Sequence, residues 1–481
     1  MRLSTETLDR LPADVVRPAY DRAAVKAGVV HLGIGAFHRA HQAAYLEAAL
    51  NSGDLRWGII GVSLRSAGVR DQMVPQEGLY TMLVRDGTAE QAQLIGAVQT
   101  VLVAPEDPAA VVAAIASPDT HLVTLTITEK GYKLDRATGG LLADDADVAH
   151  DMASLEAPRT APGFIVAGLA ARRAAGLAPL TVISCDNLPH NGALLRDAVL
   201  AMAMAHDESL VAWIAEECAF PATMIDRIVP ATTDADIAAL AERLGLEDRA
   251  MVKTEPFTQW VVEEKFAGER PNLAAFGVQL TDRVAPWEDA KLRLLNGSHS
   301  GIAYLGGLAG DAFVHEFVSR PAGRRFVEAL WDEAQDTLDP PAGLDIPAYR
   351  AELMARFANP SLQHRTRQIA MDGSQKLPQR LLAGIAERRA RGQSVGALAL
   401  AVAAWMRWQA GVTDAGERFT VDDPLAEALG AANAAAATVA DRVEALLGVL
   451  GIALDEEAKA AIATRLDTIE RSGALAAVEA L

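Results

Sequence analysis

Short apolar runs that end in glycine-rich or polar segments recur through the first half of the chain. The first run ends at Leu32, meets Gly33 and Gly35, and is followed by helix-favouring residues from 36 to 50. Three more apolar, β-branched runs begin at Trp57, Thr120 and Leu180. Helical patterns such as "AAVVAAIASP" and "APGFIVAGLAARRAAG" separate them. Strands that alternate with helices predict βαβ units and a parallel sheet, whose ligands bind at the carboxyl ends of the strands.

The pattern changes near residue 285. In "RVAPWEDAK", Pro286 can occupy the first turn of a helix, and long segments rich in Ala, Leu, Glu and Arg then replace the strand-like runs. The predicted fold is therefore α/β, with a Rossmann-type dinucleotide-binding domain and a parallel sheet over residues 1–285. A mostly α-helical substrate-binding and catalytic domain is expected over residues 286–481. Within it, the Ala-rich segment 430–450 is expected to form one amphipathic helix.

The charge balance and the cysteine content narrow the possible partners. There are 63 acidic and 44 basic residues, and the net charge of -19 repels nucleic acid and anionic membranes. Cys185 and Cys218 form no CxxC motif and no Cys/His cluster, so neither a disulfide framework nor a zinc site is expected. No stretch has the apolar length of a signal peptide or a membrane span. We expect a cytoplasmic protein, and nothing in the sequence marks an oligomer interface.

The turn after the first predicted strand has part of a dinucleotide-binding pattern. A glycine-rich turn lets backbone N–H groups and a helix N-terminus approach a pyrophosphate. Gly33-x-Gly35 fits, but His38 stands where the third glycine would be, and a plain tight turn is an equal reading. The acid that selects NAD at the end of the second strand is also missing, since Arg65 and Arg70 precede Asp71. The choice between NAD and NADP is therefore left open.

A polar cluster interrupts the apolar segment "KLRLLNGSHS". At about 100° per residue in an α-helix, Lys291, Asn296 and His299 span an arc of roughly 140° and share one face. A lysine among apolar neighbours has a lowered pKa and suits a general base, and an asparagine can stabilise a developing oxyanion. The alternative is a snorkelling lysine, a capping asparagine and a core histidine. The cluster lacks the ligands of a good metal site.

Several longer motifs carry a resemblance to a known family. They include "GIGAFHRAHQA", "TITEKGY", "SCDNLPHNG", "DRIVP", "EPFTQWVVEEKF" and "MDGSQKLPQR", together with the spacing Lys291-x4-Asn296-x2-His299. In this order they resemble the mannitol dehydrogenase family of polyol-specific long-chain dehydrogenases. The resemblance implies a zinc-independent, nicotinamide-dependent oxidoreductase. A short-chain or zinc alcohol dehydrogenase would need a Tyr-x3-Lys pair or Cys and His ligands, and neither is found.

The resemblance also implies roles for individual residues. Lys291 matches the general acid/base, and Asn296 and Asn187 match the amides that hold the reacting oxygen. His299 matches a histidine beside that oxygen, and Glu288 a carboxylate that connects the lysine to solvent. The positions that match cofactor-binding segments are Gly33, Gly35, Phe37, Arg39, Asp226 and Arg227. NAD is the cofactor that the family favours, with NADP still open.

Within the family, the sequence is most similar to the fructuronate-reducing branch. It has "TEKGY" where mannitol 2-dehydrogenases tend to have "TEGGY", and Gln368 where they place an arginine eight residues before the counterpart of Lys376. "QIAMDGSQKLPQR" recurs in the fructuronate branch. The implied reaction is the NAD-dependent, metal-free reduction of D-fructuronate to D-mannonate and its reverse. The alternative is a mannitol 2-dehydrogenase or another oxidoreductase of the family that acts on arabinitol or tagaturonate.

A sugar acid carries a carboxylate that a polyol lacks, and a partly dry site needs cations to bind it. The expected substrate-binding residues are Lys376, Arg365 and Lys130, of which Lys376 matches a substrate-contacting position in the family. Arg367 and Arg380 are also available, and a surface charge is an equal reading of both.

Overall fold

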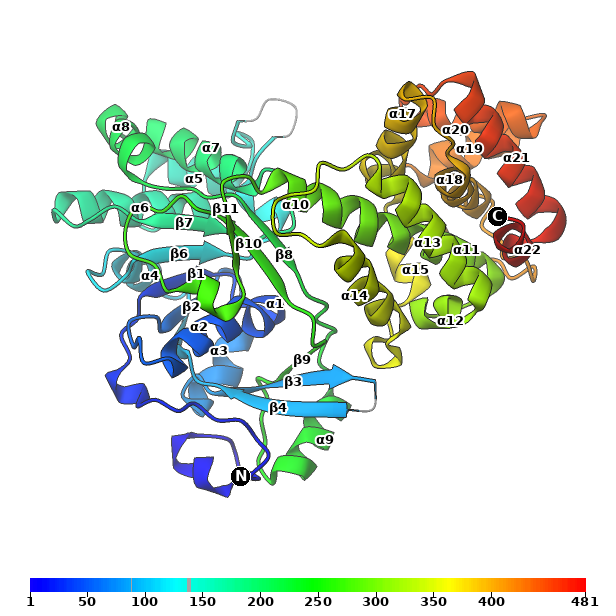
Figure 1. The fold of residues 1–481 in the computed structure, drawn as a ribbon. Helices are drawn as coiled ribbons and strands as arrows, with labels where there is room; N and C mark the ends of the chain where they lie inside the picture. The colour runs from blue at the N-terminus through cyan, green and yellow to red at the C-terminus, as the bar shows by residue number, and fades with distance from the viewer. Residues whose placement is uncertain (88, 136–139) are drawn as a thin grey trace. The chain divides into compact units, whose positions relative to one another are not determined.

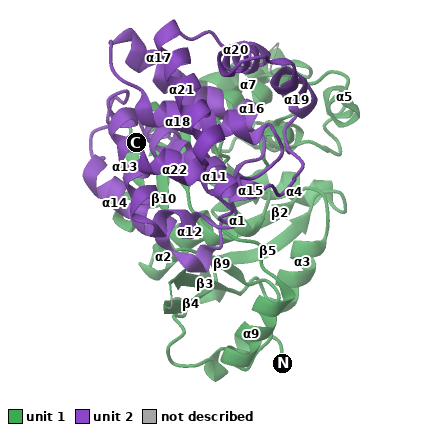
Figure 2. Ribbon diagram, turned by 90° about the vertical axis from the view of Figure 1, so that its right-hand side faces the viewer, with its two compact units in different colours: residues 1–285 green, residues 286–481 purple. Residues whose placement is uncertain are grey.

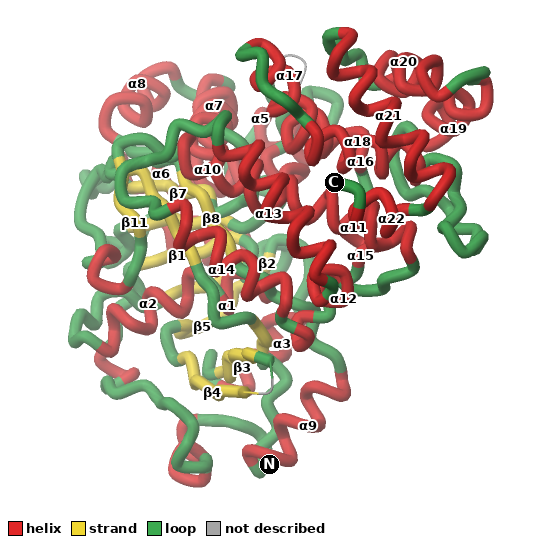
Figure 3. Tube along the Cα trace, turned by 45° about the vertical axis from the view of Figure 1, so that its right-hand side comes forward, coloured by secondary structure: helices red, strands yellow, loops and turns green. Residues whose placement is uncertain are grey.

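A computed structural model describes residues 1–87, 89–135 and 140–481 of the chain (Figure 1). It forms two compact units, Met1–Ala285 and Pro286–Leu481, which Figure 2 shows in green and purple. Among the described residues, all the extended strands belong to the first unit, and the second unit is built from helices (Figure 3).

A five-stranded parallel sheet lies at the centre of the first unit. Its order is β5-β2-β1-β6-β7, and every neighbouring pair is parallel, as predicted. The strands are β5 (Val98–Val103), β2 (Ile59–Ser63), β1 (Val29–Leu32), β6 (Leu122–Leu125) and β7 (Thr181–Ser184). The strand order reverses between β1 and β6, so ligands are expected outside the carboxyl ends of these two strands.

Helices cover both faces of this sheet, which explains its almost continuous apolar runs. On one face, Val30 and Leu32 pack with α4 (Pro108–Ile115), α6 (Ala161–Ala174) and α7 (Asn191–Met204). On the other face, Val29 packs with α1 (Ala36–Ala40) and α2 (Gln42–Asn51). These two apolar layers hold the carboxyl ends of the strands in fixed positions.

The single helix expected from residue 36 to residue 50 is interrupted at His41. His41 has φ -122° and ψ -88°, outside the helical region, and it separates α1 from α2. The His41 Nε2 atom lies 2.8 Å from the carbonyl oxygen of Gln259, a residue far away in the sequence. We attribute the break to this tertiary hydrogen bond, which local helix propensity does not encode.

Two small sheets complete the first unit, and the apolar pattern did not predict them. One has the order β4-β3-β9 and the other β11-β10-β8. Their strands are β3 (Tyr80–Asp86), β4 (Ala89–Ile95), β8 (Thr223–Asp226), β9 (Val252–Thr254), β10 (Gln259–Glu263) and β11 (Gln279–Thr281). The remaining α-helices of this unit are α3 (Gly68–Met73), α5 (Ala146–Ala153), α8 (Glu208–Glu217) and α9 (Asp234–Leu244). The next helix, α10 (Ala285–Ala290), begins at the last residue of the first unit.

The second unit is built around two buried helices, α11 (Gly297–Ala309) and α18 (Gly396–Trp408), which pack on each other. Gly301 on α11 also lets the ring of Phe326 approach the helix closely, because a Cβ at this position would lie 2.9 Å from that ring. The surrounding α-helices are α12 (Val314–Ser319), α13 (Pro321–Gln335), α14 (Ile346–Ala358), α15 (Thr366–Ile369), α16 (Gly373–Leu377), α17 (Ala383–Ala390), α21 (Glu456–Ser472) and α22 (Ala474–Glu479). Within the described ranges, no helix is both long and apolar enough to cross a bilayer.

The prediction of one amphipathic helix over residues 430–450 is wrong. The segment contributes to two helices, α19 (Ala426–Ala435) and α20 (Val439–Val449). Thr438 caps α20, since its Oγ accepts from the Asp441 N–H at 3.1 Å and its own N–H donates to the Asp441 carboxylate at 3.1 Å. This capping box starts a new helix where the alanine content alone suggested continuation.

Candidate active site

The turn after β1 has the geometry of a phosphate-binding turn. Gly33 has φ +92°, and a Cβ there would lie 2.3 Å from the carbonyl oxygen of Thr126, so only glycine fits. Gly35 caps α1, and a Cβ on it would meet only the Gly33 oxygen at 3.9 Å. This space lies at the first turn of α1, where N–H groups have no partner within the helix. The residues present therefore fit a diphosphate group.

His38 replaces the third glycine of the pattern by packing flat against β1. Its ring stacks on His31 with centroids 3.3 Å apart and an interplanar angle of 14°. The His31 ring nitrogens lie 2.7 Å from Thr124 Oγ1 and 2.9 Å from Thr126 Oγ1, both on or just after β6. Burial lowers the pKa of His31 to about 3, so the ring is neutral near pH 7. The stacked pair joins α1, β1 and β6 beneath the glycine turn.

Two arginines expected at the cofactor, Arg39 and Arg227, are buried and bind backbone carbonyl groups. Arg39 donates to Ala250 O, and Arg227 donates to Ala40 O and, at 3.0 Å, to Glu255 O. Burial lowers the pKa of both guanidinium groups. They fix the position of α1, and their contact with a cofactor stays a prediction.

The other predicted cofactor residues lie near the same helix or at the end of a strand. Phe37 stacks on His41 with ring centroids 5.1 Å apart, and Asp226 is the buried last residue of β8. Beyond β2, Arg70 is paired with Glu106 and with Asp71, whereas Arg65 is exposed and has no ion-pair partner among the described residues.

The sequence analysis missed Asp186, which organises the loop after β6. Its carboxylate accepts hydrogen bonds from the N–H groups of Ile127 at 3.1 Å and Thr128 at 2.8 Å, and from the Tyr132 hydroxyl at 2.7 Å. Burial raises the pKa of this carboxyl group. Thr128 has φ +64°, a strained backbone that these bonds stabilise. Asp186 thereby also fixes the chain next to Asn187, the predicted substrate amide at the end of β7.

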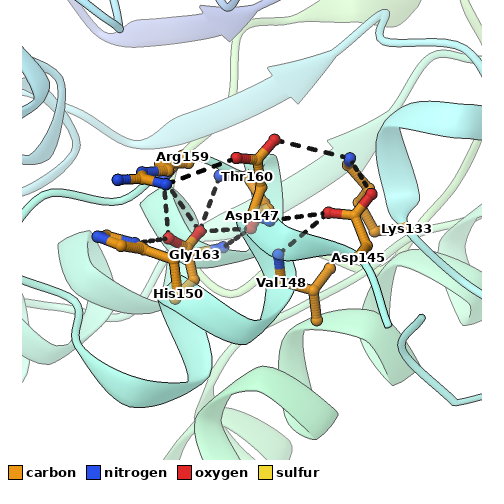
Figure 4. A network of polar contacts seen from close by, with 9 residues as sticks. Lys133, Asp145, Asp147, Val148, His150, Arg159, Thr160 and Gly163 are labelled. Atoms are coloured by element: carbon orange, nitrogen blue, oxygen red, sulfur yellow. Dashed lines mark hydrogen bonds and ion pairs between the residues drawn. The ribbon is translucent and has the colours of Figure 1, made fainter. Parts of the chain in front are cut away.

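Lys130 lies in this loop, in the short helical turn η4 (Glu129–Tyr132), and its side chain is exposed. Lys133, directly after this turn, belongs to the polar network in Figure 4. Lys133 donates to Asp145 at 2.6 Å, and the buried Asp151 accepts from the N–H and hydroxyl groups of Thr160 at 2.8 and 2.7 Å. The chain on either side of Lys130 is therefore held, by Asp186 at Thr128 and by Asp145 at Lys133.

We expect Asp186→Ala to lower the free energy of unfolding by about 3 kcal/mol or more. It leaves the N–H groups of Ile127 and Thr128 without their acceptor, and each unsatisfied buried donor costs roughly 1–3 kcal/mol. Urea denaturation measures the change, with the exposed Asp119→Ala as the matched control. A loss no larger than that of the control would show that Asp186 does not hold the loop.

In the second unit, Lys291–Asn296 forms a π-helical turn, η6, instead of the α-helix assumed from the sequence. The Gly297 N–H donates to the Leu292 carbonyl, five residues back. Because hydrogen bonds in a π-helix join residues five apart, Lys291 and Asn296 lie closer to one face than they would in an α-helix. Such turns occur frequently at functional sites.

Two polar side chains that follow Lys291 have no hydrogen-bond partner in the part of the chain that the structure describes. Among the described residues, neither the Asn296 side-chain amide nor the ring nitrogens of His299 make a hydrogen bond. The His299 ring packs against Phe357 and His364, with centroids 4.8 and 4.9 Å away. Burial, and then the charges of nearby groups including Lys291, hold the pKa of His299 well below its usual value. It is therefore a neutral imidazole that can donate and accept.

Lys291 itself is buried, with 8% of its surface exposed. Glu288 precedes it by one helical turn, on α10, and is half-buried. A shielded amino group close to amide and imidazole groups can exchange a proton with a substrate hydroxyl. The roles of Lys291 and Glu288 in this exchange stay predictions.

The predicted substrate-binding cations of this unit differ in their surroundings. Lys376 is half-buried on α16 and donates to the Met371 carbonyl at 2.6 Å. Arg365 is exposed and lies over the ring of Phe313, 5.4 Å from its centroid. Arg367 is a surface charge paired with a glutamate. Lys376 is therefore the better placed of the three.

No group of three or more His, Cys, Asp or Glu residues that could hold a metal ion is found in the described part of the chain.

Comparison with known proteins decides the family. The mannitol dehydrogenase Rossmann domain matches residues 27–275, and the mannitol dehydrogenase C-terminal domain matches residues 283–470. The chain belongs to the mannitol dehydrogenase family. This confirms the resemblance and the predicted fold class, and the chain is an oxidoreductase of this family.

Individual relatives differ in their substrates. The chain is 44% identical to the D-mannonate oxidoreductase of Escherichia coli strain K12, over 92% of both chains. It is 41% identical to a mannitol 2-dehydrogenase of Pyrenophora tritici-repentis, over all of this chain and 86% of the other. A solved Pseudomonas fluorescens mannitol 2-dehydrogenase, in complex with NAD and D-mannitol, is 38% identical with a TM-score of 0.84, covering 100% and 99% of the two chains. These identities are too similar to select a substrate.

Proposed function

We propose that this mannitol dehydrogenase family member reduces D-fructuronate to D-mannonate with NADH and catalyses the reverse oxidation. The observation that carries the proposal is positive charge beside Asn296. Arg380 lies in the segment 378–382, which packs on η6, and among the described residues no carboxylate pairs with it. Lys376, one helical turn earlier, already lies 3.7 Å from the carboxylate of Asp372. A sugar acid would neutralise this charge, whereas a polyol would not.

Residues 1–285 supply the cofactor site in this proposal, and residues 286–481 supply the substrate site. The Gly33 and Gly35 turn fits the diphosphate of NAD, the ligand of the P. fluorescens relative. NAD, when bound, takes the hydride from the carbon that is oxidised. We infer NAD over NADP because Arg70, one of the two arginines that follow β2, is already paired with carboxylates, and Arg65 alone of these two could meet a 2'-phosphate.

The residues of the chain move the proton and hold the reacting oxygen. Lys291 takes the proton of the mannonate C5 hydroxyl during oxidation and returns it during reduction of the ketone. The neutral His299 and the Asn296 amide donate hydrogen bonds to the oxygen as it gains negative charge. No step requires a metal ion, so activity should survive EDTA.

A coupled assay of the purified chain with fructuronate, tagaturonate and fructose, each with NADH and NADPH, tests the proposal. We expect kcat/KM for fructuronate to exceed that for fructose by at least about 10²-fold, because an unpaired buried charge costs several kcal/mol. NADH should be preferred over NADPH. Comparable efficiencies with fructose and fructuronate would favour a mannitol 2-dehydrogenase instead.

A further inference from the structure

Arg380 lies in a second π-helical turn, η8 (Pro378–Leu382), in which the Ala383 N–H donates to the Pro378 carbonyl. Pro378 has no N–H for the Ser374 carbonyl, and its ring prevents a normal α-helical turn. The two π-helical turns, η6 and η8, pack on each other. A Cβ on Gly297 would lie 3.1 Å from the Arg380 carbonyl oxygen. Arg380 is therefore fixed against the turn that carries Lys291 and Asn296.

The Arg380 guanidinium points along the start of α11. Its Nη1 donates to Ser300 Oγ at 3.2 Å and weakly to the Asn296 carbonyl at 3.4 Å. It is also close enough to His299 for its charge to help lower the pKa of that histidine. The guanidinium thus lies beside both unpartnered polar groups of the candidate site.

This cation is not neutralised by the protein. Among the described residues no carboxylate forms an ion pair with Arg380, and its Nε and Nη2 atoms donate to none of them. Burial lowers the pKa of Arg380 to about 10, so it is still charged near pH 7. Arg293 on η6 is different, because its two terminal nitrogens bind both oxygens of Glu387, at 2.6 and 2.7 Å.

A partly buried guanidinium with two free donor atoms matches the fork geometry of a carboxylate. Lys376 fits this role less well, since it donates to Met371 O and lies 3.7 Å from the carboxylate of Asp372. Arg365 is exposed over Phe313. We propose that Arg380 binds the carboxylate of the sugar-acid substrate and so selects it over neutral ketoses and polyols, an assignment that rests on the proposed function.

The test compares Arg380→Gln with the wild type on fructuronate and on fructose. We expect kcat/KM for fructuronate to fall by about 10²-fold or more, mainly through KM, because a desolvated charge pair is lost. The efficiency with fructose should stay within about threefold, a change of less than 1 kcal/mol. Arg471→Gln on α21, which removes an exposed arginine paired with Asp467, is the matched control and should leave both efficiencies unchanged.

Arg380→Lys provides a second measurement, since it keeps the positive charge but removes the planar guanidinium that can donate two parallel hydrogen bonds to a carboxylate. It should recover part of the lost fructuronate efficiency with an unchanged thermal midpoint. Equal losses on both substrates, in a wild type that prefers fructuronate, would overturn the assignment of Arg380 and leave the proposed function intact. A wild type without that preference would overturn the proposed function and the assignment with it.

Discussion

Lys291→Ala is expected to lower kcat for fructuronate reduction by about 10² to 10⁴-fold, the usual contribution of a general acid or base. The ammonium group is buried on η6, next to groups that have no protein partner, so no other described side chain of this turn can replace it. The Kd for NADH should change little, because the predicted phosphate-binding turn is formed by Gly33 and Gly35 and does not include Lys291. Stopped-flow reduction and NADH fluorescence titration measure the two quantities.

The control for this prediction is Lys459→Ala. Lys459 lies on α21, where it binds Glu444 and Glu456 at the surface, and its loss should leave kcat unchanged. The pH profile is a second readout, since the variant should lose the limb that reports titration of the base. Retention of more than about a tenth of the wild-type kcat would exclude Lys291 as the general acid/base.

Asn296→Ala is expected to lower kcat by about 10² to 10³-fold, the effect of removing one donor to a developing oxyanion. Its side-chain amide bonds to no described residue, so the thermal midpoint should hardly move. This combination separates a catalytic role from a structural one. Asn296→Asp should be at least as damaging, because it places negative charge where the substrate oxygen becomes negative.

Steady-state kinetics and thermal unfolding of the same preparations test this prediction. Asn433→Ala on α19 is the matched control and should affect neither quantity. A large fall in thermal midpoint with a small change in kcat would assign Asn296 to folding instead of catalysis.

Four strands of the parallel sheet, β1, β2, β6 and β7, could be predicted because burial of both faces produces short apolar runs bounded by turns. The edge strand β5 was missed, since its residues are only in part buried. The break at His41 could not, since it depends on a hydrogen bond to Gln259 that forms only in the folded chain. The small sheets were also missed. β9 and β11 are three residues long, too short for an alternating pattern to be recognised.

Among the site residues, the cluster from Lys291 to His299 could be predicted from polar residues in an apolar segment. Its π-helical geometry could not, because this single sequence carries no signal for i→i+5 hydrogen bonding. Asp186 lies in the motif "SCDNLPHNG", and its position directly before Asn187 was the signal that could have identified it. Arg367 and Arg380 could not be distinguished from the sequence. The folded structure separates them, because Arg367 is exposed and paired with a glutamate, whereas Arg380 is largely shielded from solvent.

The π-helical turn also constrains the length of the chain. A π-helical turn holds one residue more than the α-helical turn it replaces, and η6 continues directly into the buried helix α11. Losing that residue would rotate everything after it by about 100°. Gly301 would then turn away from Phe326, and His299 would leave the face of Lys291. Packing and chemistry therefore depend on the same residue count, so insertions and deletions between Lys291 and Gly301 should be far less tolerated than substitutions.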